Sequence, residues 1–471
     1  MSDNDSDTSE QQQEADLSSS DVVTKYKAAA DIANGALDKI VRAVKPGAKL
    51  GELCSLGDKS VLDAVGTMFK GKAIEKGLAF PTCISPNSVA GHLSPAADDE
   101  TTIHDGDVVK IDLAAHIDGF IACVAHTVVV QSEPVKGNTA DALAAAHTAL
   151  EAALRLVRPG KKIADVAGPL NTIVESYGCT LVEGVLSHQL KQFVVDGNKC
   201  ILNRPNPEAK VEDGEFEENE VYALDILVST GEGKPKITDE KQTTVYKRAL
   251  DVEYRLKMAA SRQVFSEINK NYPTMPFSTR VLDARNCRLG MVECLNHGLL
   301  HPYPVMHERA GAVIVQLKAT VLLMPNGSDK VTGLAPQPHE SEKSITDDDV
   351  KALLATSLKS KKKPKKKSKA GKKTANGSAA DPEANEAETS QTASKKPELR
   401  EGTASPAAAS EGAPAAKSSA STKSGNAAAP IPEAAEAETS QTAAKKPANG
   451  AAPAEEASAE SALKSAAKAQ S

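Results

Sequence analysis

Two side chains of metal-binding type, Asp112 and Cys123, lie eleven positions apart (123 − 112 = 11) in a strongly apolar stretch. This stretch spans residues 107–130 and reads DVVKIDLAAHIDGFIACVAHTVVV. Asp118-Gly119 at its centre is a dipeptide that favours a tight type I′ turn, which predicts a β-hairpin. Because side chains alternate between the two faces of a strand, such a turn puts Asp112 and Cys123 on the same face. The carboxyl and the thiol are therefore expected to converge, as two metal ligands would.

The stretch resembles the methionine aminopeptidase family, in which two Asp, one His and two Glu hold a dinuclear metal site. The resemblance extends over roughly residues 22–340, and further segments of it read GVLSHQLKQ, EVYALDILVSTGEG and VQLKATVLLMPNG. It places the five ligand positions at Asp112, Cys123, His188, Asp225 and Lys318. A Cys thus stands where the second Asp is expected, and a Lys stands where the metal-bridging Glu is expected.

These exchanges oppose metal binding, because two adjacent dications need several anionic oxygens to offset their repulsion. Asp112 and Asp225 supply two negative charges, whereas Cys123 adds charge only as a thiolate and favours a softer metal such as zinc. Two unit charges about 4 Å apart interact by about 4 kcal/mol at an effective dielectric near 20, and a dication doubles this. We therefore expect Lys318 to fill the metal site as a permanent counter-ion, paired with Asp112 or Asp225. The alternative is a remnant single-metal site of Asp112, Cys123 and His188.

Longer segments resemble the non-peptidase branch of this clan, the proliferation-associated, ErbB receptor-binding proteins. They include VVTKYKAAADIANGAL, AFPTCISPNSVAGHLSP, LSHQLKQFVVDG and MPFSTR. The resemblance implies the fold of type 2 aminopeptidases without peptidase activity or cofactor, in a monomer that regulates growth. Members of this branch associate with ribosomes and RNA in the nucleolus, nucleus and cytoplasm. His92, in the GHLSP segment, stands where active enzymes keep a substrate-handling His; without a metal, we expect it to be packed or solvent-facing.

Two segments that could position this site share one pattern, a helix, a (Lys/Arg)-Pro-Gly break and a second helix. They read DIANGALDKIVRAVKPGAKLGELCSLGDKSV and ALEAALRLVRPGKKIADVAGPLNTIV. Pro and Gly end the first helix of each pair, and alternating strands follow. Gly47 and Gly160 are 113 residues apart (160 − 47 = 113). The pattern predicts a pseudo-symmetric α/β (α+β) unit, in agreement with the creatinase/aminopeptidase-like pita-bread fold that the resemblance implies. A chance similarity of two helical hairpins is the alternative.

The stretch between Asp225 and Lys318 is too long for a simple strand connection. Helical patterns near YRLKMAASRQVFSEINK and ARNCRLGMVECLNHG predict an inserted helical subdomain at roughly 240–305. It is fairly basic, with Arg255, Lys257, Arg262, Lys270, Arg280, Arg285 and Arg288. These cations predict a partner surface or, alternatively, ordinary solvated helix faces.

Composition divides the rest of the chain of 471 residues. Residues 1–21 hold seven acids and no Lys or Arg, which predicts an acidic disordered N-terminus. The aminopeptidase-like domain is expected at 22–340 and a short helix at 341–358, with acids at its start. A Lys-rich run occupies 359–373, and 374–471 form a low-complexity disordered tail, because such a segment buries too little apolar surface to fold. Its duplicated PEA(N/A)EAETSQTA(S/A)KKP segment predicts a flexible spacer or a phosphorylation platform.

The short helix carries Val350-Lys351-Ala352-Leu353-Leu354, where relatives have a Leu-x-x-Leu-Leu co-regulator motif. Val shrinks the first anchor, so we do not infer that docking mode.

The Lys-rich run predicts affinity for polyanions with low sequence specificity, because Lys supplies point charges without stacking or bidentate base contacts. The expected RNA- or ribosome-binding residues are Lys359, Lys361, Lys362, Lys363, Lys365, Lys366, Lys367, Lys369, Lys372 and Lys373. An import signal and a merely solubilising tail are the alternatives. Lys25 and Lys27 match a basic pair that in relatives is associated with nucleolar residence.

Seven cysteines without paired spacing, an N-terminus without an apolar signal region and the lack of a long apolar run predict a reducing cytosol or nucleus and no membrane insertion. Three functions remain open. The favoured one is a non-catalytic protein that binds ribosomes or structured RNA, most of all the large ribosomal subunit near the peptide exit, and so regulates growth, ribosome biogenesis or translation. The others are an active metallo-aminopeptidase that removes initiator Met, and a signalling adaptor or transcriptional co-regulator that binds receptor tails.

Overall fold

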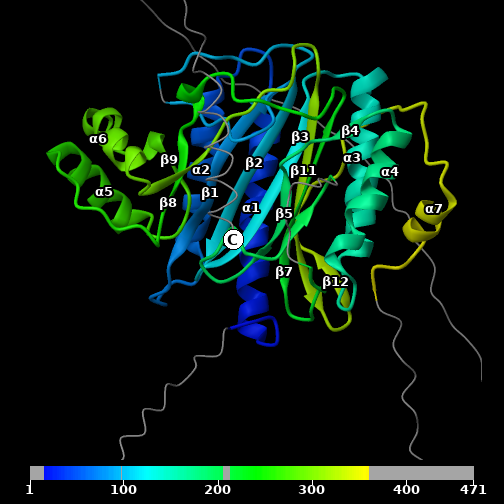
Figure 1. The fold of residues 1–471 in the computed structure, drawn as a ribbon, viewed down its shortest axis with the longest axis horizontal. Coiled ribbons are helices and arrows are strands. Elements are labelled where there is room, and N and C mark those ends of the chain that lie inside the picture. Colours follow the sequence, from blue (N-terminus) through cyan, green and yellow to red (C-terminus); the bar gives the residue numbers. More distant parts are fainter. Residues whose placement is uncertain (1–14, 97, 205–212, 360–471) are drawn as a thin grey trace, which may run out of the picture. The chain divides into compact units, whose positions relative to one another are not determined.

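One large antiparallel sheet organises the protein (Figure 1). The computed structural model describes residues 15–96, 98–204 and 213–359, all of which belong to one compact unit. The sheet has nine strands, in the order β1-β2-β3-β11-β7-β5-β6, with β12 paired to β11 and β4 paired to β7. The strands are β1 Lys76–Pro86, β2 Val108–Ile117, β3 Phe120–Val129, β4 Thr180–Leu181, β5 Leu186–Leu190, β6 Cys200–Leu202, β7 Val221–Ser229, β11 Ile314–Met324 and β12 Gly327–Lys330.

Two pairs of helices pack against this sheet, one pair on each half. The pairs are α1 Ser20–Ala43 with α2 Leu50–Thr67, and α3 Gly137–Leu156 with α4 Ala167–Ser176. Helices α1 and α2 contact β1, β2 and β3, whereas α3 contacts β7 and β11. Both predicted helix pairs are therefore confirmed, and together they cover one face of the sheet.

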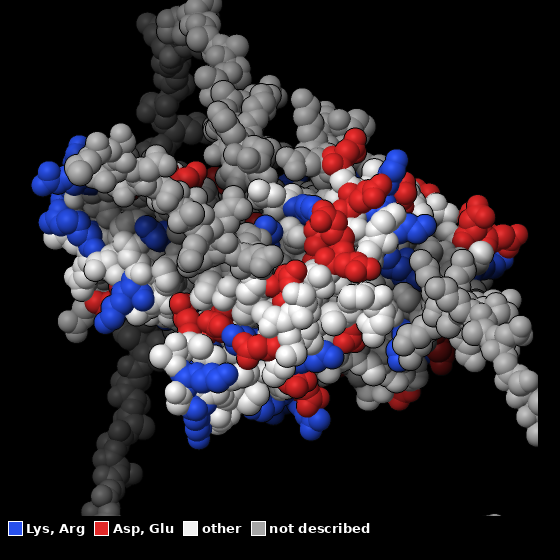
Figure 2. Space-filling model, turned by 90° about the horizontal axis from the view of Figure 1, so that it is seen from below, with Lys and Arg blue, Asp and Glu red and all other residues white. Residues whose placement is uncertain are grey.

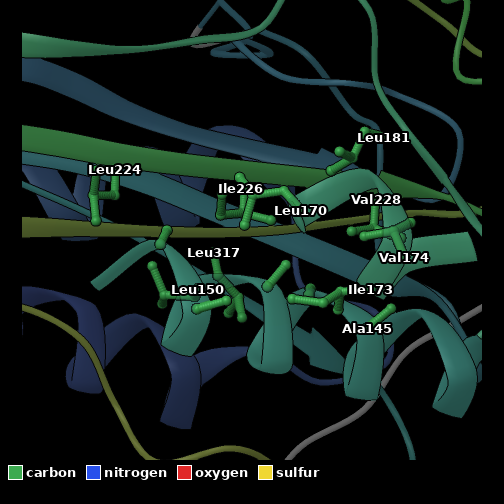
Figure 3. Packing of buried hydrophobic residues seen from close by; sticks show 14 of the residues in the cluster. Ala145, Leu150, Leu170, Ile173, Val174, Leu181, Leu224, Ile226, Val228 and Leu317 are labelled. Atoms are coloured by element: carbon green, nitrogen blue, oxygen red, sulfur yellow. The ribbon is translucent and has the colours of Figure 1, made fainter. Parts of the chain in front are cut away.

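The helix-facing side of the second half is aliphatic (Figure 3). Leu224, Ile226 and Val228 alternate along β7 and pack against apolar side chains of α3 and α4. The residues between them, including Asp225, point to the opposite face because strand side chains alternate. One strand thus contributes both to the core and to the site.

The two halves repeat in backbone detail. Gly47 (φ +83°) and Gly160 (φ +78°) both adopt the left-handed conformation after the first helix of each pair. The N–H of Gly47 donates to the carbonyl of Ile103, and that of Gly160 donates to the carbonyl of Phe216, at 2.8 Å each. The acceptors have the same offset as the glycines (216 − 103 = 113). This agreement confirms the predicted pseudo-symmetric pita-bread fold.

The insert is not purely helical, which corrects the prediction. Helices α5 Ala259–Asn271 and α6 Ala284–Asn296 pack on a small sheet ordered β10-β8-β9. The strands are β8 Val245–Arg248, β9 Phe277–Ser278 and β10 Leu300–Tyr303. They are too short to show a reliable two-residue period in the sequence, whereas the two helices show their period clearly.

The N-terminal end of the predicted domain shifts slightly, and the C-terminal helix lies within its predicted range. Leu17 is buried and α1 begins at Ser20, so the folded region starts within the segment predicted as the acidic terminus. The short C-terminal helix, α7, runs Asp348–Leu354 and is capped by Asp347, whose carboxylate accepts from Val350 N–H at 2.9 Å. Val350 is buried against α3, which leaves the altered co-regulator motif facing the core. Residues 1–14 and 360–471, and with them most of the predicted tail regions, lie outside the described residues. Among the helices of the described segments, none is long and apolar enough to span a bilayer.

Candidate functional site

Three of the five predicted ligand positions, Asp112, Lys318 and Asp225, lie in one row across four strands, on the face away from the helices. Register pairs Asp112 on β2 with Ala125 on β3, Ala125 with Lys318 on β11, and Lys318 with Asp225 on β7. The turn residues Asp118 and Gly119 both have positive φ (57° and 76°), as the predicted type I′ hairpin requires. The strand pairing, rather than any local motif, therefore assembles the two carboxylates around one lysine.

Lys318 bridges both carboxylates. Its Nζ lies 2.6 Å from Oδ2 of Asp112 and 3.1 Å from Oδ2 of Asp225. All three side chains are buried, with 11% or less of each exposed. The ammonium also lies 5.9 Å from the centre of the Phe80 ring, which adds a cation–π contact. The expected pairing of Lys318 with these aspartates is thus present in the structure.

Gln316 is a second donor to the carboxylates, and it was not among the predicted site residues. Its Nε2 donates to Asp225 Oδ1 at 3.0 Å and lies 3.4 Å from Asp112 Oδ2. Its Oε1 has no hydrogen-bond partner among the described residues. Gln316 precedes Lys318 by two residues and so shares its face of β11, a relationship that the two-residue period could have revealed.

The charges of this cluster depend on one another. Burial disfavours the charged form of Lys318, but Asp112 and Asp225 outweigh this and raise its pKa far above the ordinary value. Burial and the negative charge of Asp225 raise the pKa of Asp112, against the lowering effect of Lys318. The raised pKa of Lys318 favours its charged form, whereas the raised pKa of Asp112 favours its neutral form. The 2.6 Å contact between them favours the charged pair at neutral pH. Lys318 therefore stays protonated and acts as a fixed cation, not as a proton acceptor.

Cys123 is a poor metal ligand in this environment, and His188 lies against a backbone carbonyl. Burial raises the pKa of the Cys123 thiol to about 12, so the thiolate that a metal requires is disfavoured. Burial lowers the pKa of His188, which keeps its imidazole neutral, and Nδ1 lies 3.5 Å from the carbonyl oxygen of Gln189. Neither side chain is held toward Asp112 or Asp225 by a hydrogen bond within the described segments.

A second polar group borders the cluster. Asp196 accepts from Lys247 Nζ and from Tyr303 OH, both at 2.7 Å. Burial opposes its charge, but Lys247 and His188 outweigh it, and together with these hydrogen bonds they lower its pKa. Since Lys247 and Tyr303 belong to β8 and β10, this group also ties the insert to the main sheet. Distant residues make these contacts, and no sequence spacing indicated them.

His92 packs beside the cluster, which is one of the two roles expected for it, packed or solvent-facing. Its ring centre lies 5.8 Å from that of Phe80 and 5.5 Å from that of Tyr303. Nδ1 lies 3.3 Å from the carbonyl oxygen of Pro304. Burial and the nearby ammonium of Lys318 lower the pKa of His92, so its imidazole is neutral at neutral pH.

A dinuclear metal site does not fit these residues. An ammonium occupies the centre of the carboxylates, and the Gln316 amide points a second donor at them. Hard dications bind oxygen ligands that are free of such donors. Throughout 15–96, 98–204 and 213–359, no group of three or more His, Cys, Asp or Glu is arranged to hold a metal ion.

The remaining predicted residues lie apart from the cluster. Lys25 is buried and bonded to Asp21 (2.5 Å) and Asp118 (2.8 Å), so the folded chain hides it from a targeting receptor. Lys27 is half exposed and pairs with Asp329 at 3.0 Å. Lys359 is exposed at the end of the described chain, and the other nine lysines of the run lie outside the described residues.

One cation of the basic insert is not a surface residue. The guanidinium of Arg280 bonds to Asp58 of α2 at 2.5 Å and to Ser94 Oγ at 2.6 Å. Only 5% of the Arg280 side chain is exposed. It therefore anchors the insert to the main domain instead of facing a partner.

Comparison with known proteins agrees with this architecture. Residues 24–247 match metallopeptidase family M24. The chain is 53% identical to ERBB-3 binding protein 1 of Solanum tuberosum over 383 residues, which cover 80% of this chain and 99% of that protein. It is 41% identical to the curved DNA-binding protein of Schizosaccharomyces pombe over 376 residues, 77% of this chain and 98% of that one. Among solved structures, a thermophilic Arx1 superposes with a TM-score of 0.69 at 29% identity, covering 73% of this chain and all of that chain.

Proposed function

Because this chain belongs to the ERBB-3 binding protein family within metallopeptidase family M24, and because a lysine bridges its two site carboxylates, we propose that it acts without peptidase chemistry. In this proposal it docks on ribosomes or other structured RNA, with the large ribosomal subunit near the peptide exit as the main target. It would thereby regulate growth, ribosome biogenesis or translation. The contact of Lys318 with Asp112 and Asp225 is the main support for the proposed loss of catalysis.

Charge explains why peptidase chemistry is unfavourable. Asp112, Asp225 and Lys318 together have a formal charge of −1 (−2 + 1), too little to offset two adjacent dications. A unit charge about 4 Å from a dication is repelled by about 8 kcal/mol at an effective dielectric near 20. A metal would have to displace the ammonium from both carboxylates before it could bind.

Two features support docking on RNA. The Lys-rich run at 359–373 holds ten lysines in fifteen positions, which suits a polyanion. Arg255, Lys257 and Lys270 of the insert are exposed, and none of them has an ion-pair partner within the described segments. Figure 2 shows basic side chains grouped at the end of the molecule where α5 and α6 lie. The S. pombe relative is by its name a DNA-binding protein, which adds weight to a nucleic-acid target.

Co-sedimentation with purified ribosomal subunits tests this docking. We expect the full chain to pellet with the large subunit at moderate salt, and a chain lacking 359–373 to bind more weakly. Each lost contact with single-stranded RNA should lower the slope of log affinity against log salt by about 0.7. A matched deletion of the segment that starts at Pro382 should have no such effect. Unchanged binding and slope after removal of the run would refute its role.

An active aminopeptidase is the competing function. It requires metal at Asp112, His188 and Asp225 despite Lys318. Metal analysis of the purified protein, together with turnover of a Met-initiated peptide in added cobalt or manganese, separates the two possibilities. Stoichiometric metal with turnover would overturn the non-catalytic proposal.

An adaptor role is compatible with RNA docking and is favoured by one observation, the name of the 53% identical potato relative as an ERBB-3 binding protein. A pull-down with a receptor tail before and after nuclease treatment distinguishes protein-mediated from RNA-mediated capture. Burial of Val350 argues against docking through the α7 motif.

We propose that the protein resides in the cytoplasm and in the nucleus or nucleolus, which fluorescence microscopy of the tagged chain would test.

A further inference from the structure

A pocket of about 510 Å³ lies away from the carboxylate cluster, at the end of the sheet where α1 begins. Three segments form most of it: residues 15–17 before α1, the end of β5 with the turn after it, and residues 217–221 at the start of β7. Tyr26 and Lys199 complete the lining. It shares no lining residue with the group around Lys318. The pocket is therefore a separate feature that the proposed function does not use.

The charged lining of this pocket is predominantly acidic. Its acids are Asp16, Glu217, Glu218 and Glu220, and its bases are Lys191 and Lys199, which gives a formal charge of −2 (−4 + 2). Figure 2, which views the molecule from below, shows acidic side chains gathered near the middle of this end. A negative lining repels phosphate, so the pocket is unsuited to RNA.

Two of the four acids form ion pairs with Lys199, and the other two are exposed. Lys199 is shared by Glu217 (2.6 Å) and Glu220 (2.5 Å), so one cation serves two carboxylates. Glu220 also accepts from Tyr222 OH at 2.9 Å, which fixes it in the wall. Asp16 and Glu218 are exposed, and within the described segments neither is in an ion pair. Two carboxylates thus remain for a cationic ligand.

The pocket also has an apolar lining. Leu17, Leu190 and Val221 are buried there, whereas Val194 is 41% exposed. An aliphatic stem with a cationic head, as in Lys or Arg, can cover such a surface while its charge reaches the acids.

Tyr26 provides an independent indication of a ligand. It lines the same pocket, and its side chain is only 3% exposed. Its ring packs edge-on against Phe120 at 5.2 Å between centres. Its hydroxyl makes no hydrogen bond to another described residue and is not among the fully enclosed polar atoms, so it can bond to a ligand in the pocket. A peptide group in the pocket would satisfy it.

We propose that this pocket binds a Lys/Arg-rich segment, interspersed with apolar residues, of a partner protein. The segment would place its cations on Asp16 and Glu218 and its apolar side chains against Val194, with a backbone group at the Tyr26 hydroxyl. Proteins that bind RNA are rich in such basic segments, because these neutralise phosphates. The proposal goes beyond RNA docking and does not depend on it, since the site would contact protein.

Fluorescence anisotropy with the full chain tests the pocket. The probe is a labelled peptide of alternating Lys and Leu, compared with a peptide of alternating Glu and Leu. We expect binding of the Lys peptide alone. Combined Asp16→Lys and Glu218→Lys should weaken it at least about tenfold, because each reversal turns an attraction into a repulsion. Asp105→Lys, a single charge reversal at an exposed site outside the pocket, is the control for each of the two pocket reversals and should change little.

Tyr26→Phe keeps the ring and its contact with Phe120 but removes the hydroxyl, and it should weaken binding by about two- to tenfold. Urea unfolding of each variant verifies that it is folded. Equal binding of the Glu peptide, or equal losses in the pocket variants and in Asp105→Lys, would overturn the proposal. A tenfold gain of affinity after deletion of residues 360–373 would also overturn it. Such a gain would show that the chain's own basic run, and not a partner protein, occupies the pocket in the full chain.

Discussion

Asp112 and Asp225 occupy equivalent positions in the two halves of the sheet, and one ammonium links them. They are 113 residues apart (225 − 112 = 113), the same offset that separates Gly47 from Gly160. Lys318 Nζ reaches Oδ2 of both carboxylates. The pseudo-symmetry thus brings two like charges together, and the lysine between them makes their burial tolerable.

Removal of that cation should destabilise the fold. Lys318→Met leaves two buried carboxylates without a counter-ion, and loss of one partner of a buried pair costs about 3–5 kcal/mol. We expect the free energy of unfolding in urea to fall by about this amount. Lys27→Met, which removes the exposed pair with Asp329, is the control and should cost less than about 1 kcal/mol. Equal losses in the two variants would show that the cluster has no special stabilising role.

Restoration of anionic ligands should restore metal binding. Lys318→Glu combined with Cys123→Asp changes the formal charge of the cluster with Asp112 and Asp225 from −1 to −4, which suits hard dications. Isothermal titration with Mn²⁺ should then detect stoichiometric binding that the natural chain lacks. The control, Lys318→Met with Cys123→Ser, removes the cation without adding carboxylates and should bind weakly. Equally tight binding by the natural chain would contradict our interpretation of Lys318.

The two turn glycines should respond alike to substitution. Gly47 and Gly160 both have positive φ, and a Cβ at either position would meet nothing within 4 Å. Alanine there should therefore cost only the left-handed backbone penalty, about 1–2 kcal/mol. Gly35→Ala, inside α1 and equally free of contacts, should instead stabilise by about 0.5–1 kcal/mol. Urea denaturation distinguishes these signs, and clearly unequal losses at the two turns would argue against their equivalence.

Acid should weaken the contact between the sheet and α3. Burial lowers the pKa of His126 to about 4, and burial together with the neighbouring histidines lowers that of His147 to about 4. An unfolded His titrates near 6.5, so between these values the unfolded chain binds protons that the folded chain does not. Stability should therefore fall as the pH drops from about 6.5 to about 4, by up to about 1.4 kcal/mol per pH unit for each group.

Urea midpoints measured across this pH range test the expectation. His126→Asn should flatten the dependence, whereas His104→Asn should leave it unchanged because 77% of the His104 side chain is exposed. A slope that survives His126→Asn in full would assign the acid sensitivity to other groups.

Local rules account for the parts that were predicted. The Asp118-Gly119 turn, both helix pairs and the short helix α7 with acids at its start follow from preferences of a few adjacent residues. The sheet of the insert escaped prediction because its strands are two to four residues long. The burial of Lys25 escaped it too, since its partner Asp118 lies 93 residues away in the chain.

The sequence by itself determined which charges this protein can bring to its site: two aspartates, a thiol in place of a carboxylate, and a lysine in place of the bridging acid. Only the tertiary structure decided how they meet. Pairing of β11 between β3 and β7 sets Lys318 beside Asp225 and across from Asp112, and it adds Gln316 to the same carboxylates. No local preference specifies this pairing, because the strands are joined by long segments and their order depends on how the whole sheet buries its helix-facing side.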